Sequence, residues 1–162
     1  MRNPTDVLNS LSDKSKNPTY KFQRLYRNLY NPEFYLLAYK NIYANNGSMT
    51  SGVDGVTVDG MSLARIDKII ASLKDHSYRP NPARRTYIAK KKNPAKQRPL
   101  GIPSGDDKLV QEVVRMILES IYEPTFSDVS HGFRPKRSCH TALGKIQSTF
   151  TGAKWFVITT SQ

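Results

Sequence analysis

The strongest pattern of apolar positions lies in the second half of the chain, beyond residue 104. Apolar side chains recur there at intervals of three and four residues, which predicts an amphipathic helix with a wide apolar stripe. Asp106 and Asp107 precede the stripe, where negative charge stabilises a helix N-terminus, and Glu123-Pro124 ends it. We expect this helix to lie in the core. Its stripe consists of Leu109, Val110, Val113, Val114, Ile117, Leu118 and Ile121.

The first half of the chain predicts a smaller helical layer. Residues 20–30 and 34–43 show helical spacing, and Asn31-Pro32 restarts the helix between them as N-cap and first-turn proline. A third helix is expected over 62–74. Residues 1–19 are polar and are expected to form a flexible lead-in with one short helix at residues 6–11. A glycine-punctuated turn at residues 51–56 precedes an expected short strand.

The pattern changes after the proline-bounded linker at residues 78–82. Strand-forming residues on both sides of a turn at residues 92–96 predict a β-hairpin over 84–102. Ser138 can cap a last helix, and the apolar run at 155–158 predicts a buried strand. The expected fold class is therefore α+β, with helices around a short antiparallel sheet that includes this hairpin.

Composition narrows the class of partner. The 162 residues suit one domain, and 25 Lys and Arg against 13 Asp and Glu give a formal net charge of +12. Such an excess favours a polyanionic partner, most often nucleic acid. No apolar run reaches the roughly 20 residues that cross a bilayer, so no membrane association is expected. The N-terminus lacks a signal-like segment and Cys139 is the single cysteine, which together predict a cytoplasmic location.

The positive charge is concentrated in one interval. No acidic residue lies between Asp75 and Asp106, and clustered cations bind phosphate well because condensed counterions are released. The alternative is an edge hairpin kept soluble by lysines. A second basic cluster near residue 135 and the net charge favour nucleic acid. The cations of the interval are Arg79, Arg84, Arg85, Lys90, Lys91, Lys92, Lys96 and Arg98, and those of the second cluster are Arg134, Lys136 and Arg137.

Several motifs resemble group II intron reverse transcriptase/maturases in order and spacing. The two most specific are Arg98-Pro-Leu-Gly-Ile-Pro103 and Ser130-His-Gly-Phe-Arg-Pro135. The resemblance covers about residues 50–157. It implies a multidomain enzyme with fingers, palm and thumb that copies intron RNA into DNA and assists splicing. It also implies domain boundaries: an N-terminal helical extension at 20–78, fingers at 79–154 and the start of a truncated palm strand at 155–162.

The resemblance also implies roles for the cations. Lys90 and Arg98 are the candidates for binding the triphosphate of the incoming nucleotide, although Lys91 and Lys92 stay open because the register is uncertain by a residue or two. The other cations are implied to bind template or intron RNA. This RNA-binding group is Arg84, Arg85, Lys91, Lys92, Lys96, Arg134, Lys136 and Arg137.

Polymerisation of this kind needs paired carboxylates that hold two Mg²⁺ ions. In the family the first carboxylate follows a strand like Trp155-Phe-Val157, but no Asp or Glu follows Asp128 here. We therefore assign no catalytic or metal-binding residue and expect this chain alone to be inactive in polymerisation. Mg²⁺, the DNA primer and the dNTP are expected partners of the complete enzyme only.

Other interpretations stay open. The chain could be a non-enzymatic RNA-binding or splicing-assisting module that acts alone, or a fragment of a retron or CRISPR-associated reverse transcriptase. A natural truncation and a cut at the fingers boundary both fit the missing carboxylates. Homodimerisation is also open.

Overall fold

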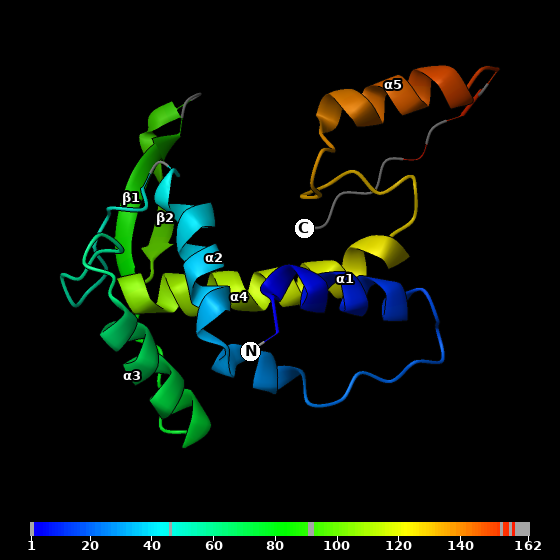
Figure 1. Ribbon diagram of the computed structural model, residues 1–162. Coiled ribbons are helices and arrows are strands. Elements are labelled where there is room, and N and C mark those ends of the chain that lie inside the picture. The colour runs from blue at the N-terminus through cyan, green and yellow to red at the C-terminus, as the bar shows by residue number, and fades with distance from the viewer. Residues whose placement is uncertain (1, 46, 91–92, 153, 156, 158–162) are drawn as a thin grey trace.

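The computed structural model describes residues 2–45, 47–90, 93–152, 154, 155 and 157. Its central element is helix α4, Gly105–Tyr122, against which the other long elements are arranged (Figure 1). The helix begins where expected because the Ser104 hydroxyl accepts a hydrogen bond from the Asp107 amide, and two aspartates lie in the first turn. Its inner face is buried, as the apolar stripe predicted.

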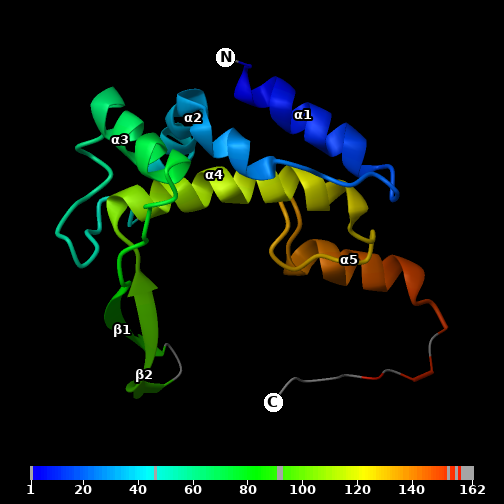
Figure 2. The same cartoon turned by 90° about the horizontal axis from the view of Figure 1, so that it is seen from below.

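Three helices cover one side of α4, as Figure 2 shows: α1 (Pro4–Ser15), α2 (Pro32–Tyr43) and α3 (Leu63–Lys74). Each begins at a residue whose side chain accepts a backbone N–H, namely Asn3, Asn31 and Ser62. The predicted helices at 34–43 and 62–74 are therefore confirmed. The side chains that lose all contact with solvent between these helices and α4 include Phe34, Tyr35, Ile66, Leu109 and Val113.

A polar contact also joins α2 to α4. Glu112 is buried and accepts hydrogen bonds from Asn41 Nδ2 at 3.0 Å and from Arg115 Nε at 2.7 Å. Burial raises the pKa of the Glu112 carboxyl, but the hydrogen bonds from Arg115 and Asn41 outweigh it and leave that pKa below its ordinary value. The carboxylate therefore stays charged inside the helical layer.

The hairpin and α5 lie on the other side of α4 (Figure 2). Strands β1 (Arg84–Lys90) and β2 (Asn93–Ile102) pair antiparallel, with Arg84 opposite Ile102 and a register irregularity between Ala89 and Lys90. The predicted hairpin is confirmed. The expectation of helices packed around the sheet is wrong, because the helices pack around α4 and the hairpin projects from its N-terminal end.

The chain leaves α4 through a short 3₁₀ helix η2, Glu123–Thr125, and a loop that leads to α5, Cys139–Thr149. Ser138 caps α5 as predicted, in a reciprocal capping box with Thr141. No residue of α5 is buried, and Leu143, Ile146 and Phe150 are all exposed.

Two segments of the N-terminal half differ from expectation. Within residues 1–19, α1 is a full twelve-residue helix that packs against α4 and buries Leu11, so tertiary contact orders a segment that local composition left weak. Residues 20–30 do not form one continuous helix. Arg24 has φ of 56°, in the left-handed region, and only the 3₁₀ helix η1, Leu25–Tyr30, follows it.

Two expected strands also differ. The segment around residues 51–56 forms turns without a strand. Of the expected strand at 155–158, the described residues Trp155 and Val157 have no regular structure and are each 90% exposed, whereas residues 156 and 158 lie outside the described part. A strand needs a hydrogen-bonding neighbour, and neither β1 nor β2 supplies one here. Within the residues that the structure describes, no helix is long and apolar enough to cross a membrane.

Candidate nucleic-acid interface

The cations of the β1–β2 hairpin point into solvent. Each described one is exposed, and their side chains make no hydrogen bond or ion pair with any residue that the structure describes. This set is Arg84, Arg85, Lys90, Lys96 and Arg98. Lys91 and Lys92 of the predicted site lie outside the described residues. The hairpin therefore presents a positive surface that nothing in the described chain neutralises.

Strand register distributes these cations over the two faces of the hairpin. Ile88 lies opposite Arg98, and side chains at directly opposed positions share a face. Because side chains alternate along a strand, Arg84 lies on the face of Ile88 and Arg98, whereas Arg85 lies on the other face. The register irregularity interrupts this alternation before Lys90, which pairs with Asn93, so the register assigns no common face to Lys90 and Arg98, the predicted triphosphate pair.

The hairpin joins the helices at a cluster of polar residues, Tyr78, Asn81, Ser104 and Asp107, which we call the root of the hairpin. Asp107 is 3% exposed and accepts hydrogen bonds from Tyr78 Oη, from Ser104 Oγ at 2.7 Å and from the backbone N–H of Asn81 at 3.0 Å. Burial raises the pKa of Tyr78 well above its ordinary value, and the hydrogen bond to Asp107 adds to this. The sequence pattern indicated only a helix-start role for Asp107, and no local signal pointed to this network.

The turn-rich segment near residues 47–57 packs closely on the same root. A Cβ on Gly52 would lie 2.6 Å from Ser104 Cα, so only glycine fits there. Lys108 Nζ donates to the backbone carbonyls of Gly47, Ser48 and Thr50 at 3.1, 3.1 and 2.6 Å. Burial lowers the pKa of Lys108, and the nearby Arg84 charge lowers it further. Lys108 therefore anchors this segment.

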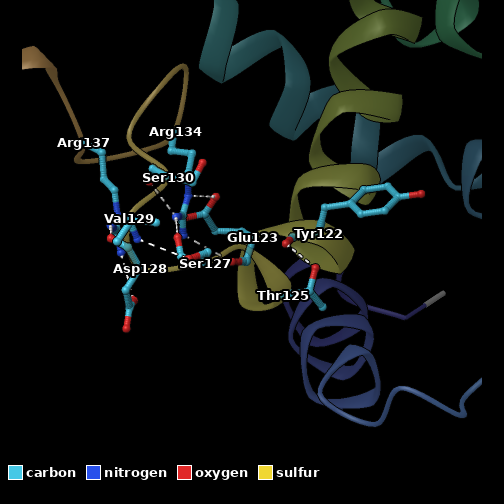
Figure 3. Close-up of polar contacts among 9 residues, drawn as sticks. All are labelled: Tyr122, Glu123, Thr125, Ser127, Asp128, Val129, Ser130, Arg134 and Arg137. Atoms are coloured by element: carbon cyan, nitrogen blue, oxygen red, sulfur yellow. Dashed lines mark hydrogen bonds and ion pairs between the residues drawn. The ribbon is translucent and has the colours of Figure 1, made fainter. Parts of the chain in front are cut away.

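The second basic cluster is arranged differently, as Figure 3 shows. The Arg134 side chain is 7% exposed and its Nη2 lies 2.8 Å from Glu123 Oε1. Arg134 Nη1 donates to the carbonyls of Ser127 and Ser130 at 2.9 and 2.8 Å. The guanidinium also lies 5.1 Å from the centre of the Phe126 ring. Arg134 thus holds the loop between η2 and α5 together from inside.

The other two cations of this cluster lie closer to solvent. Arg137 donates to the Asp128 carbonyl and reaches Asp128 Oδ1 at 3.3 Å, with a side chain that is 25% exposed. Lys136 is exposed and makes no contact of this kind with the described residues. Two of the three predicted RNA-binding residues of the loop are therefore engaged in contacts within the loop.

A largely apolar cleft of about 810 Å³ lies between the outer face of α4 and this loop. Val114 and Leu118, which the sequence pattern assigned to the core stripe, line it and are 36% and 42% exposed. Phe126 and Phe133 line it from the loop side. The apolar stripe of α4 is therefore wider than the face that α1, α2 and α3 cover. The width of the stripe in the sequence was the signal that could have indicated an uncovered apolar face. Within the described ranges, no group of three or more His, Cys, Asp or Glu could hold a metal ion.

Comparison with known proteins points to group II introns. The chain is 58% identical over 152 residues to group II intron-encoded protein LtrA of Lactococcus lactis subsp. cremoris, which covers 93% of this chain and 25% of that protein. It is 47% identical over 158 residues to an uncharacterized 91 kDa protein in the cob intron of Schizosaccharomyces pombe, covering 94% of this chain and 19% of that protein.

A shorter match is to a plant intron maturase. The chain is 49% identical over 55 residues to nuclear intron maturase 1, mitochondrial, of Arabidopsis thaliana, covering 34% of this chain and 8% of that protein. No family model matches. The chain thus spans about a quarter of the length of LtrA, and it is homologous to an N-terminal part of group II intron-encoded proteins.

Proposed function

We propose that this chain is the fingers part of a group II intron reverse transcriptase/maturase and that its β1–β2 hairpin binds the phosphates of intron or template RNA. The observation that carries the proposal is the set of exposed hairpin cations without an internal partner. The homology to LtrA supports the choice of intron RNA as the polyanion. Reverse transcription, splicing and intron mobility are the activities we propose for the complete protein.

Electrostatics explains why such a hairpin suits RNA. Each phosphate that a cation neutralises releases condensed counterions, and the logarithm of the affinity falls by about 0.7 per contact with the logarithm of salt concentration for single strands. The hairpin offers cations on both faces, and the sequence from residue 76 to residue 105 contains no carboxylate to compete with phosphate.

Within the complete enzyme, we assign Lys90 and Arg98 to the triphosphate of the incoming nucleotide. Both side chains are exposed and come from the two paired strands of one hairpin, which supports this, because one triphosphate can bridge two cations that no internal carboxylate engages. Mg²⁺, the primer and the nucleotide belong to the proposed whole enzyme, in which Mg²⁺ would supply transition-state charge stabilisation. We assign no metal-dependent step to the described residues, among which no group of three or more His, Cys, Asp or Glu could hold a metal ion.

The loop contributes less to the proposed RNA surface. Arg134 and Arg137 are engaged by Glu123 and Asp128, so a phosphate would have to displace a carboxylate or a carbonyl from each. Lys136 has no such competitor among the described residues and is the loop residue that we assign to RNA.

The test is salt-dependent binding of single-stranded intron RNA by a Lys90→Ala/Lys91→Ala/Lys92→Ala variant. We expect weaker binding and a loss of about 1.4 from the slope of log affinity against log salt, because two of the three replaced lysines, Lys91 and Lys92, are assigned to RNA at about 0.7 each. The matched control replaces Lys40, Lys68 and Lys74 with Ala, because these exposed lysines lie on α2 and α3, on the far side of α4 from the hairpin. An equal loss in both variants would show that net charge alone drives binding.

A further inference from the structure

Both ends of the β1–β2 hairpin converge on one buried carboxylate. Tyr78 and Asn81, which precede β1, and Ser104, which follows β2, all donate hydrogen bonds to Asp107 in the first turn of α4. Asn81 Nδ2 also donates to Ser104 Oγ at 3.3 Å, so the two ends contact each other directly. One side chain therefore connects the incoming chain, the outgoing chain and the central helix.

These contacts exceed what a helix cap needs. The cap of α4 needs only the Asp107 backbone N–H, which donates to the Ser104 hydroxyl at 3.4 Å. Asp107 uses further acceptor capacity for Tyr78 and Asn81, which belong to a different segment. The bonds to a charged carboxylate are also stronger than bonds between neutral groups. The network thus ties the hairpin to α4 rather than only starting the helix.

The strands themselves contribute little to the direction of the hairpin. Every residue of β1 is exposed except Thr86, which is half-buried, and the strands contact chiefly each other. Pro80, Pro82 and Pro103 stiffen the two connecting segments, because each fixes its own φ. The two connecting segments are stiff and both are bound to Asp107. The position of Asp107 on α4 therefore fixes the direction of the strands that these segments lead to.

We propose that Asp107 is the positioning residue of the hairpin: its carboxylate clamps both connecting segments to α4 and so holds the cationic faces in the orientation that RNA meets. This role rests on the proposed RNA binding for its functional consequence, but the clamp itself is a property of the chain without RNA. Asp107 contacts no RNA in this proposal. It acts through Tyr78, Asn81 and Ser104.

The first experiment measures the orientation without RNA. In a Cys139→Ser background, spin labels are placed at Gln97→Cys on β2 and Lys68→Cys on α3, both exposed positions, and their distance distribution is recorded by pulsed EPR. We expect a narrow distribution in this parent and a broad one after Asp107→Asn, because an amide offers one oxygen where the carboxylate offers two. An equally narrow distribution in the variant would overturn the proposal.

Asp106→Asn is the matched control. It removes the same charge from the same helical turn, but Asp106 pairs with Arg65 at 2.6 Å and makes no hydrogen bond with Tyr78, Asn81 or Ser104. The distribution should stay narrow in this variant, and broadening equal to that of Asp107→Asn would show that helix-terminal charge alone matters. If Asp107→Asn fails to fold, Tyr78→Phe removes a single bond of the clamp and should broaden the distribution by a smaller amount.

The second experiment separates positioning from direct contact. Asp107→Asn should weaken RNA binding about tenfold, since orientation that was fixed beforehand must then be acquired on binding. The salt slope should stay unchanged, because the cations are all present, whereas Arg85→Ala should lower it by about 0.7. A lower slope in Asp107→Asn would contradict the positioning role. Absence of any salt-dependent RNA binding by the parent would refute the proposed function and leave the EPR result standing.

Discussion

The β1–β2 hairpin and the loop from Glu123 to Arg137 are both rich in cations, yet their cations have opposite relations to the rest of the chain. In the hairpin the described cations are exposed, and the residue that organises its root is an anion, Asp107. In the loop the organising residue is itself a cation, Arg134, with its guanidinium buried against Glu123. A basic cluster can therefore be either a surface for a partner or the internal framework of a loop.

Carboxylates in the sequence account for the difference. Glu123 and Asp128 lie within ten or so residues of Arg134 and Arg137, close enough for the loop to fold back onto them, and the distances are 2.8 and 3.3 Å. The hairpin interval contains no carboxylate. A bidentate guanidinium contact favours carboxylate and carbonyl oxygens that are already nearby over phosphates that must be brought from solution.

The largest expected effect comes from removing the organiser of the loop. Arg134→Ala should lower the free energy of unfolding by about 3 kcal/mol, because it leaves Glu123 and two carbonyl groups without their buried partner. Urea denaturation followed by circular dichroism measures this. Arg134→Lys should recover only part of the loss, since an ammonium cannot form the planar fork. Unchanged stability together with a smaller RNA salt slope would make the loop resemble the hairpin and break the comparison.

An intermediate effect, with a dependence on alkaline pH, is expected at the root of the hairpin. Tyr78→Phe should cost about 2 kcal/mol near neutral pH, the range for a hydrogen bond to a charged group. The pKa of Tyr78 is raised in the folded protein. Its hydroxyl therefore contributes fully to the free energy of unfolding below the ordinary tyrosine pKa of about 10, and this contribution is lost as pH rises further.

The stability difference between the parent and Tyr78→Phe should therefore shrink at alkaline pH. Urea titrations at a series of pH values up to the alkaline range measure it. Tyr43→Phe is the matched control, since that tyrosine is exposed and should show little difference at any pH. A stability difference between the parent and Tyr78→Phe that increases with pH would contradict the assigned role of Tyr78, because a protonated phenol that donates a hydrogen bond stabilises the fold less as pH rises.

The smallest expected effect is at Arg137. Its partner Asp128 has a side chain that is 88% exposed, so Arg137→Ala should change the free energy of unfolding by only about 0.5 kcal/mol. The same variant should leave the RNA salt slope unchanged. A fall of about 0.7 in that slope would move Arg137 into the RNA-binding surface and would sharpen the boundary between the two regions.

Much of the fold followed from local pattern. Spacing of apolar residues located α2, α3 and α4, and Asn31 and Ser138 were recognisable as caps from the sequence. The hairpin followed from strand composition on both sides of a turn. These features depend on neighbours within a few residues, which is why periodicity and capping rules identify them.

The predictions that were wrong concern segments whose structure depends on contacts with residues far away in the sequence. Residues 4–15 form a helix with Leu11 in the core because α4 supplies the surface on which they pack. The apolar spacing at 20–30 suggested one helix, yet Arg24 adopts the left-handed region and the chain turns there. Val114 and Leu118 continue the stripe of α4 but line a cleft, since the helical layer covers only part of that stripe.

The candidate site divides in the same way. The sequence alone determined which cations exist, that residues 76–105 hold no carboxylate, and that the motifs resemble group II intron proteins. Tertiary structure decided which cations are free, because Arg134 meets Glu123 only after the loop folds back on η2. It also brought Asp107 to Tyr78, 29 residues away in sequence, at the root of the hairpin. Charge is a property of composition, whereas its availability to a partner depends on which oxygens the fold has already placed beside it.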